Sequence, residues 1–447
     1  MATDWVALSY ALTVTSLVSI ALYAVIYTKL RLKSSSETSH LLQTSEGFLT
    51  AKKSQGMYRI AWSFYAGSVG SWCITSPSNY ATYAGWIGMI FMAIGTGVPL
   101  IVQSYFGSMV QSKYPTVNSF GDFITARFGP TAKLACIGVA LINMAVMMLA
   151  EFTTIGGLFR DFVGTEGFPI ILIVATVTTV YTMYGGLLVS IVTDQVQGIT
   201  SVVLITTISI YVAATFKREL PPNFGSLKQS LGPNQSGYSS ILVMPASLMS
   251  SVMFNEGMWQ RVWAAKDPQS LKRGGVLACL AVVSVVFLFG LGGFLAAWGG
   301  LIDFQTGNPN LYLFQVFKSS PNQNNVHVNQ FIEVLVLVLA AVMNESAIDS
   351  VQNGLAATIS TQFLRGKPLI WARGCVLVIT VIIVPFALAN YAVLSIFLLP
   401  SILAVCWLFP VMLGGIWDTP LGLRVVSESS LIFGGLAAVL SVSAYGI

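Results

Sequence analysis

The chain has 447 residues, of which 55% are hydrophobic and only 9% are charged. Because an ordinary soluble domain carries about 25% charged residues, this composition argues against a soluble enzyme, a nucleic-acid-binding module and a disordered scaffold. The net charge is +5, and all five cysteines fall in apolar stretches, which indicates free thiols rather than a disulfide framework.

A membrane-spanning helix needs about 20 mostly apolar residues, and the sequence contains twelve such stretches. We therefore expect an integral membrane protein with about 12 transmembrane helices in a lipid bilayer. The predicted spans are 5–28, 58–80, 83–111, 131–160, 168–185, 190–216, 240–259, 274–298, 330–362, 369–390, 392–415 and 430–447.

The basic residues predict how these spans are oriented. Lys29, Arg31 and Lys33 follow the first span like a stop-transfer cluster, so we expect that helix to be retained rather than cleaved as a signal peptide. With the N-terminus outside, 17 of the 22 Lys and Arg residues lie on the inner side and the remaining five on the outer side. We expect an outside N-terminus and a location in the plasma membrane.

Two spans contain residues that weaken a helix. Between Ala66 and Pro77 the second span has two glycines, three serines and a proline, and the seventh span carries Pro245 among several serines. Freed carbonyls at a broken helix can coordinate a cation, and half-helix ends can hold a polar solute. Close packing of small residues is the alternative explanation.

The two candidate breaks also suggest how the chain is organised. Five spans separate the start of the second span from the start of the seventh, and an odd number reverses direction, so the two units would be inverted repeats. We expect five segments. These are an extra N-terminal helix with a cytosolic loop (1–57), a first five-helix repeat (58–216), an outer loop (217–239), a second five-helix repeat (240–415) and a C-terminal helix (416–447).

Acidic residues within spans are rare because a charge at the bilayer centre costs at least about 2.5–3.5 kcal/mol. The exceptions are Glu151, Asp194, Glu256, Glu345 and Asp349. Asp194 and Glu256 lie near helix ends, where an interfacial position is expected. Glu345 and Asp349 are four residues apart on one face of the ninth span, which predicts a cation or proton site; a water-lined vestibule without a bound ion is the alternative.

The sequence lacks the motifs of other driving mechanisms and of catalysis. Gly-x-x-x-x-Gly-Lys-Ser/Thr does not occur, which argues against a nucleotide-binding domain on this chain, and neither does His-Glu-x-x-His. The two histidines, His40 and His327, fall in predicted loops. We expect no enzyme activity, no catalytic residue, no organic cofactor, no nucleic-acid partner and no obligate protein partner.

The stretch from Tyr181 to Gln197 resembles the sodium:solute symporter family, whose members typically read Tyr-Thr-x-x-Gly-Gly-Leu and then Thr-Asp-x-x-Gln. Val189 departs from the Ala, Ser or Pro usual there. Residues 254–267 resemble the family's Phe-Asn-Gln…Gln-Arg…Ala-Lys-Asp stretch, with Glu256 replacing Gln. The Trp-containing, small-residue stretch 66–76 is similar to the family's first core helix. The resemblance covers about residues 1–415.

This resemblance implies an all-α fold of the leucine-transporter type, with ten core helices in inverted repeats, and import of a solute with sodium or, less often, protons. By position, a sodium site would use the carbonyls of Ala66 and Val69 and groups from the ninth span. There Asn344 and Glu345 replace the family's hydroxyl ligands. Glu345 would then bind sodium directly, or be protonated and carry the coupling proton, and Asp194 and Asp349 could share either role.

The solute is expected between the broken second span and its neighbours. If Glu151 faces the pocket, a cationic or urea-like solute is favoured; if it faces another helix, it forms a structural pair. The expected function is symport of a small polar solute (urea, an amino acid, a polyamine or a monocarboxylate) by alternating access, and the alternative is a non-transporting sensor or an uncoupled facilitator of the same fold. The predicted solute contacts are Trp72, Cys73, Asn143, Glu151, Ser250 and Met253.

Overall fold

The computed structural model describes residues 2–34, 51–224, 230–305, 307–317, 330–389, 391–416 and 426–445. Within these ranges the chain is helical except for short connections and one isolated β-bridge. Residues 35–50 of the predicted cytosolic loop lie outside the described ranges. Nine of the described helices are long and apolar enough to cross a membrane, or ten if one bent pair is counted as a single span.

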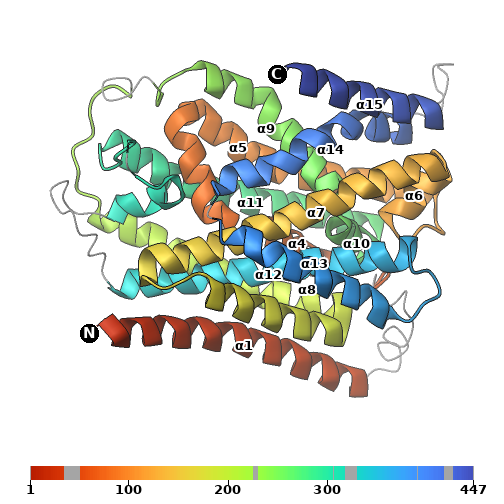
Figure 1. Ribbon diagram of the computed structural model, residues 1–447, viewed down its shortest axis with the longest axis horizontal. Helices are drawn as coiled ribbons and strands as arrows, with labels where there is room; N and C mark the ends of the chain where they lie inside the picture. Colours follow the sequence, from red (N-terminus) through yellow and green to blue (C-terminus); the bar gives the residue numbers. More distant parts are fainter. Residues whose placement is uncertain are drawn as a thin grey trace.

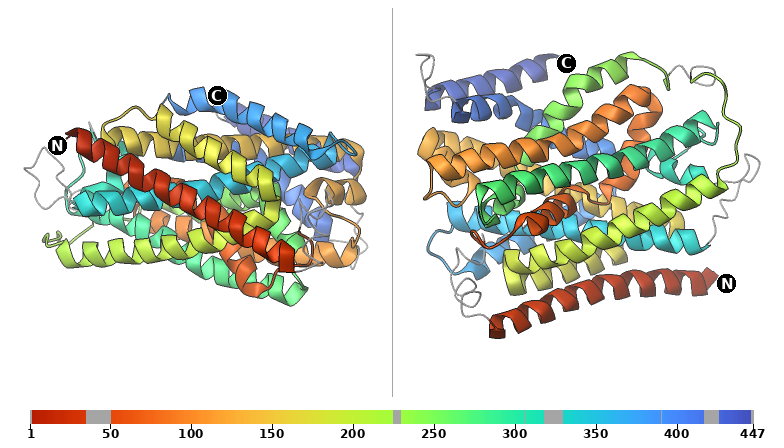
Figure 2. Two further views of the ribbon diagram at one scale, coloured as in Figure 1. Left: turned by 90° about the horizontal axis from the view of Figure 1, so that it is seen from below. Right: turned by 180° about the vertical axis from the view of Figure 1, so that it is seen from behind.

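The first helix, α1 (Ala2–Ser34), lies along one edge of the molecule beside α8 (Phe168–Thr215), opposite the C-terminal helices (Figures 1 and 2). Its Ala24 packs into a small apolar cluster with Tyr181 and Val189 of α8. The extra N-terminal helix is therefore held against the bundle by side-chain packing.

The predicted second span is broken, as its composition suggested. It consists of α4 (Met57–Ser68) and the first part of α5 (Trp72–Lys113), separated by three residues. The next join lies at Gly85, beyond the predicted gap between spans at 80–83. Gly85 has φ 66°, and a Cβ there would lie 2.6 Å from the Gly232 carbonyl oxygen, so both conformation and space require glycine.

Four elements complete the first half of the core. They are the short helix α6 (Phe120–Arg127), the long helix α7 (Pro130–Leu158), the π-helical turn η1 (Phe159–Val163) and α8. Helix α8 changes direction at Gly186, where φ is 54°. This position falls in the gap between the predicted spans 168–185 and 190–216.

The second half repeats this order and begins with another broken helix. Helix α9 (Gln235–Met253) and helix α10 (Glu256–Ala264) meet at an angle of 67°, so the span extends five residues beyond its predicted end at 259. The elements that follow are α11 (Pro268–Trp298), the 3-10 helix η2 (Pro309–Phe317), α12 (Gln330–Gln362), α13 (Leu369–Ala387), α14 (Val393–Ile416) and α15 (Glu428–Tyr445).

The ten apolar spans become twelve, as expected, when α5 is divided at Gly85 and the shorter apolar helix Phe168–Met183 is included. The two broken helices stand at equivalent places in the two halves of the chain. The repeat boundaries 58–216 and 240–415 stay predictions, although the helix ends fall close to them.

A backbone bridge joins α4 and α10, one piece of each broken helix. The segment before α4 pairs in parallel with the end of α10 at Gln55 and Ala265. Lys53 N–H donates to the Trp263 carbonyl at 3.0 Å, Gln55 N–H to Ala264 at 2.9 Å, and Lys266 N–H to Gln55 at 2.8 Å. We call this pairing the backbone bridge.

Candidate solute and cation sites

A small cavity lies where the two broken helices meet α5, α7 and α14. Its lining is apolar and aromatic with a few neutral polar groups, and none of the described lining residues is charged. The residues that line it are Gly67, Ser68, Trp72, Thr96, Met147, Leu248, Ser251, Val252, Asn255, Met258 and Phe397.

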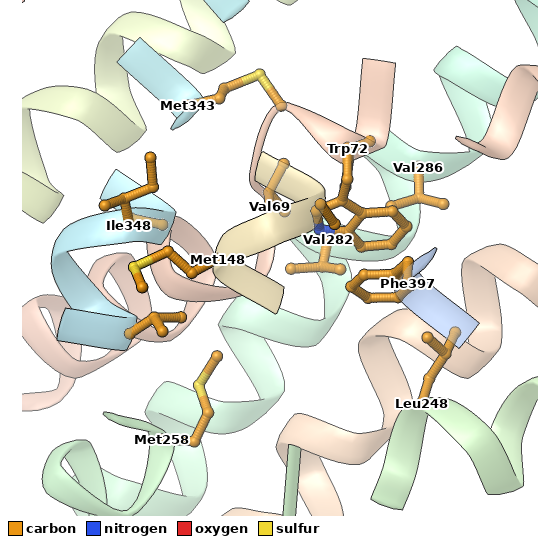
Figure 3. Close-up of a cluster of buried hydrophobic side chains, with 14 of the residues drawn as sticks. Val69, Trp72, Met148, Leu248, Met258, Val282, Val286, Met343, Ile348 and Phe397 are labelled. Carbon is orange, nitrogen blue, oxygen red and sulfur yellow. The ribbon is translucent and has the colours of Figure 1, made fainter. Parts of the chain in front are cut away.

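Two stacked rings cover one side of this central cavity. The rings of Trp72 on α5 and Phe397 on α14 have centroids 4.0 Å apart and planes inclined by 15°, and Figure 3 shows them face to face beside Leu248. Both side chains are buried. The two rings therefore join α5 and α14 on this side of the cavity.

Glu151 on α7 occupies the polar end of the broken span. Its Oε2 accepts hydrogen bonds from the Ser71 N–H at 2.9 Å, the Ser71 hydroxyl at 2.6 Å and the Asn344 amide at 2.9 Å. Ser71 precedes the first residue of α5, so the carboxylate lies at a helix N-terminus, where an anion is favoured. Among the described residues, no Lys or Arg forms an ion pair with Glu151.

Gly70→Ala is expected to displace this carboxylate, because a Cβ at residue 70 would lie 1.8 Å from Glu151 Oε1. Overpacking of this kind typically costs about 1–3 kcal/mol, so we expect lower thermal stability in detergent. Gly138→Ala on α7 is the matched control, since nothing lies within 4 Å of its added Cβ. Equal unfolding temperatures for the two variants would contradict the described position of Glu151.

Asn143, on the same face of α7, holds the other broken helix. Its amide donates to the carbonyls of Ser251 at 3.0 Å and Phe254 at 3.2 Å, at the end of α9. Asn143 and Glu151 are eight residues apart, with Met147 between them, so the three share one helix face. Helix α7 therefore binds both breaks, one through an amide and the other through a carboxylate.

Consecutive residues of α12 face different neighbours, because each helical residue turns about 100°. Asn344 points to the first break, where it also donates to the Ser71 hydroxyl at 2.9 Å and the Glu151 carbonyl at 2.8 Å. Glu345 faces α8 beside Gln197. The proposed sodium ligands Ala66 and Val69 stand at the break with Asn344, whereas Glu345 belongs to a separate acidic group.

The carboxylates of Asp349 and Asp194 both accept hydrogen bonds from neighbouring side chains. Asp349 accepts from the Tyr181 hydroxyl at 2.8 Å and the Thr193 hydroxyl at 3.1 Å, and also from Ser190. Asp194 forms a buried ion pair with Arg261 at 3.0 Å. A carboxylate is stabilised inside a protein by such hydrogen bonds and by an opposite charge.

Arg261 of α10 connects four elements. Its guanidinium donates to the Ser63 carbonyl at 3.0 Å on α4, to Asp194 on α8, and to the Ser350 hydroxyl at 2.6 Å on α12. A further bond to Gly257 at 2.6 Å lies within α10. This arginine network lies next to Gly67, a lining residue of the cavity.

Glu345 differs from the other acids in the group. It is fully buried, and neither carboxyl oxygen has a hydrogen-bond partner among the described residues. The amide of Gln197 lies beside it, outside hydrogen-bond geometry, and is also without a partner in the described part of the chain. An ionised carboxylate in this setting would be an uncompensated buried charge, so a proton or a metal cation is needed to neutralise it.

Of the predicted solute contacts, the structure places only Trp72 in the lining of the cavity. Asn143 and Glu151 lie behind it at the breaks. Ser250 donates to the carbonyls of Ser247 and Ser401, Met253 accepts from the Trp259 indole, and Cys73 is buried beside the first break. Asp194 and Glu256 are both buried inside the protein, and their interfacial position in the membrane stays a prediction.

Sequence reasoning missed several residues of the two sites. Met147 could have been found from its position midway between Asn143 and Glu151 on one helix face, and Asn255 from its place in the second family-like stretch. Phe397 and the ion-pair role of Arg261 carry no local signal, because their partners are distant in sequence.

No protein-family model matches the chain. The chain is similar to two curated fungal proteins. The spermidine transporter DUR31 of Candida albicans is 25% identical over 409 residues, covering 90% of this chain and 75% of the relative. The probable urea active transporter 1 of Schizosaccharomyces pombe is 24% identical over 267 residues, covering 55% of this chain and 40% of the relative.

The fold is also similar to solved structures. A Na+-coupled sialic acid symporter in a substrate-bound outward-open state has a TM-score of 0.66 at 16% identity, covering 97% of this chain and 96% of that one. Mhp1, a nucleobase-cation-symport-1 family transporter, has a TM-score of 0.56 at 14% identity, covering 82% of this chain and 78% of that one. These likenesses establish the fold.

Three predictions are confirmed together. The chain has the leucine-transporter-type fold, it is a secondary transporter, and it resembles the sodium:solute symporters. Its many apolar helices identify it as an integral membrane protein. The assignments of individual solute and cation ligands stay predictions.

Proposed function

We propose that this transporter imports a small neutral or cationic solute of the urea and polyamine class, together with sodium or a proton. The observation that carries the proposal is the position of Glu151 at the N-terminus of α5. A half-helix N-terminus in a broken span can bind an anionic solute group. Here the protein's own carboxylate fills that place, which disfavours a monocarboxylate or another anion.

The lining of the central cavity supports the same class of solute. No described lining residue is basic, so an anion would find no opposite charge, whereas the face of Trp72 attracts a cation. The backbone and side-chain oxygens of Ser68, Ser251 and Asn255 suit the many N–H donors of urea or a polyamine. The names of the two fungal relatives, a spermidine transporter and a probable urea transporter, agree with this choice.

Glu345 is the proposed centre of ion coupling, with Asp349 and Asp194 as neighbours. As a proton carrier it would be neutral when loaded. As a sodium ligand it would supply oxygen to the ion, and Asn344 with the carbonyls of Ala66 and Val69 would form a second place for sodium at the break. The carboxylates of Asp349 and Asp194 accept hydrogen bonds or form an ion pair with other side chains. Glu345 has no such partner among the described residues, so it is the acid most in need of a cation.

The proposed mechanism is alternating access in the plasma membrane with the N-terminus outside. The stacked pair Trp72–Phe397 closes the cavity toward the predicted outer side, and the arginine network closes it toward the predicted inner side. In this proposal, separation of the stacked pair lets solute enter the cavity from outside, and opening of the arginine network lets it leave to the inside. No catalytic residue takes part in this proposal.

Uptake by purified protein in proteoliposomes tests the proposal. With sodium and pH gradients imposed separately, we expect labelled spermidine or urea to accumulate under at least one gradient and labelled monocarboxylate not to accumulate. Collapsing the gradient with an ionophore should abolish accumulation. Uptake that follows only the solute's own gradient would indicate an uncoupled facilitator, and accumulation of the monocarboxylate alone would overturn the assigned solute class.

Trp72→Ala is expected to reduce this uptake at least tenfold, since it removes one of the two aromatic side chains that line the cavity and form the stacked pair. Trp371→Ala is the matched control, because Trp371 on α13 is 64% exposed on the outside of the bundle. If both variants transport like the wild type, the central cavity is not the solute site.

A further inference from the structure

A second space lies away from the central cavity, on the flank of the molecule. It is a groove of about 240 Å³ between the second part of α8, the end of α11 and η2. Seen from behind, the second part of α8 and α11 run along the same flank (Figure 2, right). Apart from Ser209, its named lining residues are apolar or glycine.

The groove opens sideways toward the bilayer. Leu288 and Ala213, which form part of its wall, are exposed at the surface of the molecule, Leu288 by 37%. Both helices are among those apolar enough to span a membrane, so hydrocarbon chains surround this flank. The groove shares no lining residue with the central cavity and is therefore separate from the solute site.

A cationic group stands at the end of the groove. The side chain of Arg218 lies over the end of α11, where its Cδ is 3.3 Å from a Cβ built on Gly299. Gly299 is one turn beyond Leu295, a lining residue. No hydrogen bond or ion pair to the Arg218 guanidinium occurs among the described residues, and Lys217 beside it is exposed.

Neighbouring residues indicate that Arg218 is at headgroup depth. Helix α8 ends at Thr215, immediately before Phe216 and the two basic residues. Trp298, the last residue of α11, donates its indole N–H to the Pro221 carbonyl at 3.1 Å. Tryptophan is typical of the boundary between hydrocarbon and water, so the groove lies in hydrocarbon and the guanidinium at the level of phosphate groups.

We propose that this flank groove binds a membrane glycerophospholipid, with one acyl chain between α8 and α11 and its phosphate against Arg218. Apolar walls open to the bilayer accept an acyl chain without loss of polar contacts. Guanidinium and phosphate form paired, charge-assisted hydrogen bonds. A sterol would fill the walls but leave Arg218 without an anion, and the polar solute of the central cavity does not suit an apolar groove.

Native mass spectrometry of the full chain, released from membranes in a mild detergent, tests this inference. We expect the wild type to retain one phospholipid per protein. Ala213→Trp, which fills the groove, should reduce the retained fraction at least fivefold. Ala214→Trp is the matched control, because Ala214 is equally exposed on α8 but does not line the groove, and it should retain the lipid.

Arg218→Gln provides a second test that does not alter the apolar packing. It should reduce the retained phospholipid at least threefold while the unfolding temperature of the delipidated protein is unchanged. Equal retention in the wild type and Ala213→Trp, retention of a sterol instead, or a wild type that carries no phospholipid would each overturn the inference. None of these outcomes depends on transport, so the proposed function is tested separately.

Discussion

Arg261→Met is expected to lower the free energy of unfolding by about 3–5 kcal/mol, the usual cost of removing one partner from a buried ion pair. The reason is that Asp194 would remain fully buried with its charge uncompensated. The variant would also leave the Ser63 carbonyl and the Ser350 hydroxyl without their donor. Chemical or thermal unfolding of the purified protein in detergent measures the change.

Two further variants make this result specific. Arg261→Met combined with Asp194→Asn removes both charges and should recover more than half of the loss, because a neutral amide costs less to bury than an unpaired carboxylate. Arg273→Met, at an exposed position of α11, should change stability by no more than about 0.5 kcal/mol. If the single and double variants are equally unstable, the loss comes from packing rather than from the charge on Asp194.

Glu345→Gln is expected to reduce gradient-driven uptake at least tenfold without lowering protein abundance or the unfolding temperature. The amide is nearly the same size, and the carboxyl it replaces makes no hydrogen bond with a described residue, so folding does not depend on the acid. Coupling would depend on it, since an amide can neither carry the proton nor supply negative charge for a cation.

The kind of uptake that the Glu345→Gln variant loses distinguishes a coupling proton from coupling sodium. If Glu345 carries a proton, uptake driven by a pH gradient is lost while exchange of labelled for unlabelled solute continues. If it binds sodium, uptake persists with a higher sodium requirement, because the amide still offers one oxygen. Glu333→Gln at the start of α12 is the matched control and should transport like the wild type. Unchanged coupling in Glu345→Gln would exclude this residue from the ion site.

Local composition predicted the helices and the first break well, whereas the second break lies at residues 254–255, beyond Pro245 and the serines that suggested it. The small residues and proline between Ala66 and Pro77 weaken one helix, and the structure breaks it at residues 69–71. The predicted gap between the spans 168–185 and 190–216 contains Gly186, whose positive φ is readily adopted by glycine. Such features follow from backbone preferences within a few residues, which is why the sequence alone reveals them.

The arrangement of the sites depends on contacts that no local pattern encodes. The spacing of Glu345 and Asp349 correctly placed them on one face of α12, but their neighbours on α8 come from over 150 residues away. Asn344 was grouped with Glu345 because the two are adjacent in sequence, although adjacent helical residues point in different directions. Phe397 entered the central cavity only through the packing of α14 against α5 and α9.

The backbone bridge limits how the transporter can move. Its three main-chain hydrogen bonds connect the start of α4 to the end of α10 whatever their side chains do, and Arg261 ties the same two pieces together again. We therefore expect α4 and α10 to move together rather than independently. In the proposed alternating-access mechanism, this connection predicts that both helices rotate in one step, so that the solute and the coupling cation would be released together.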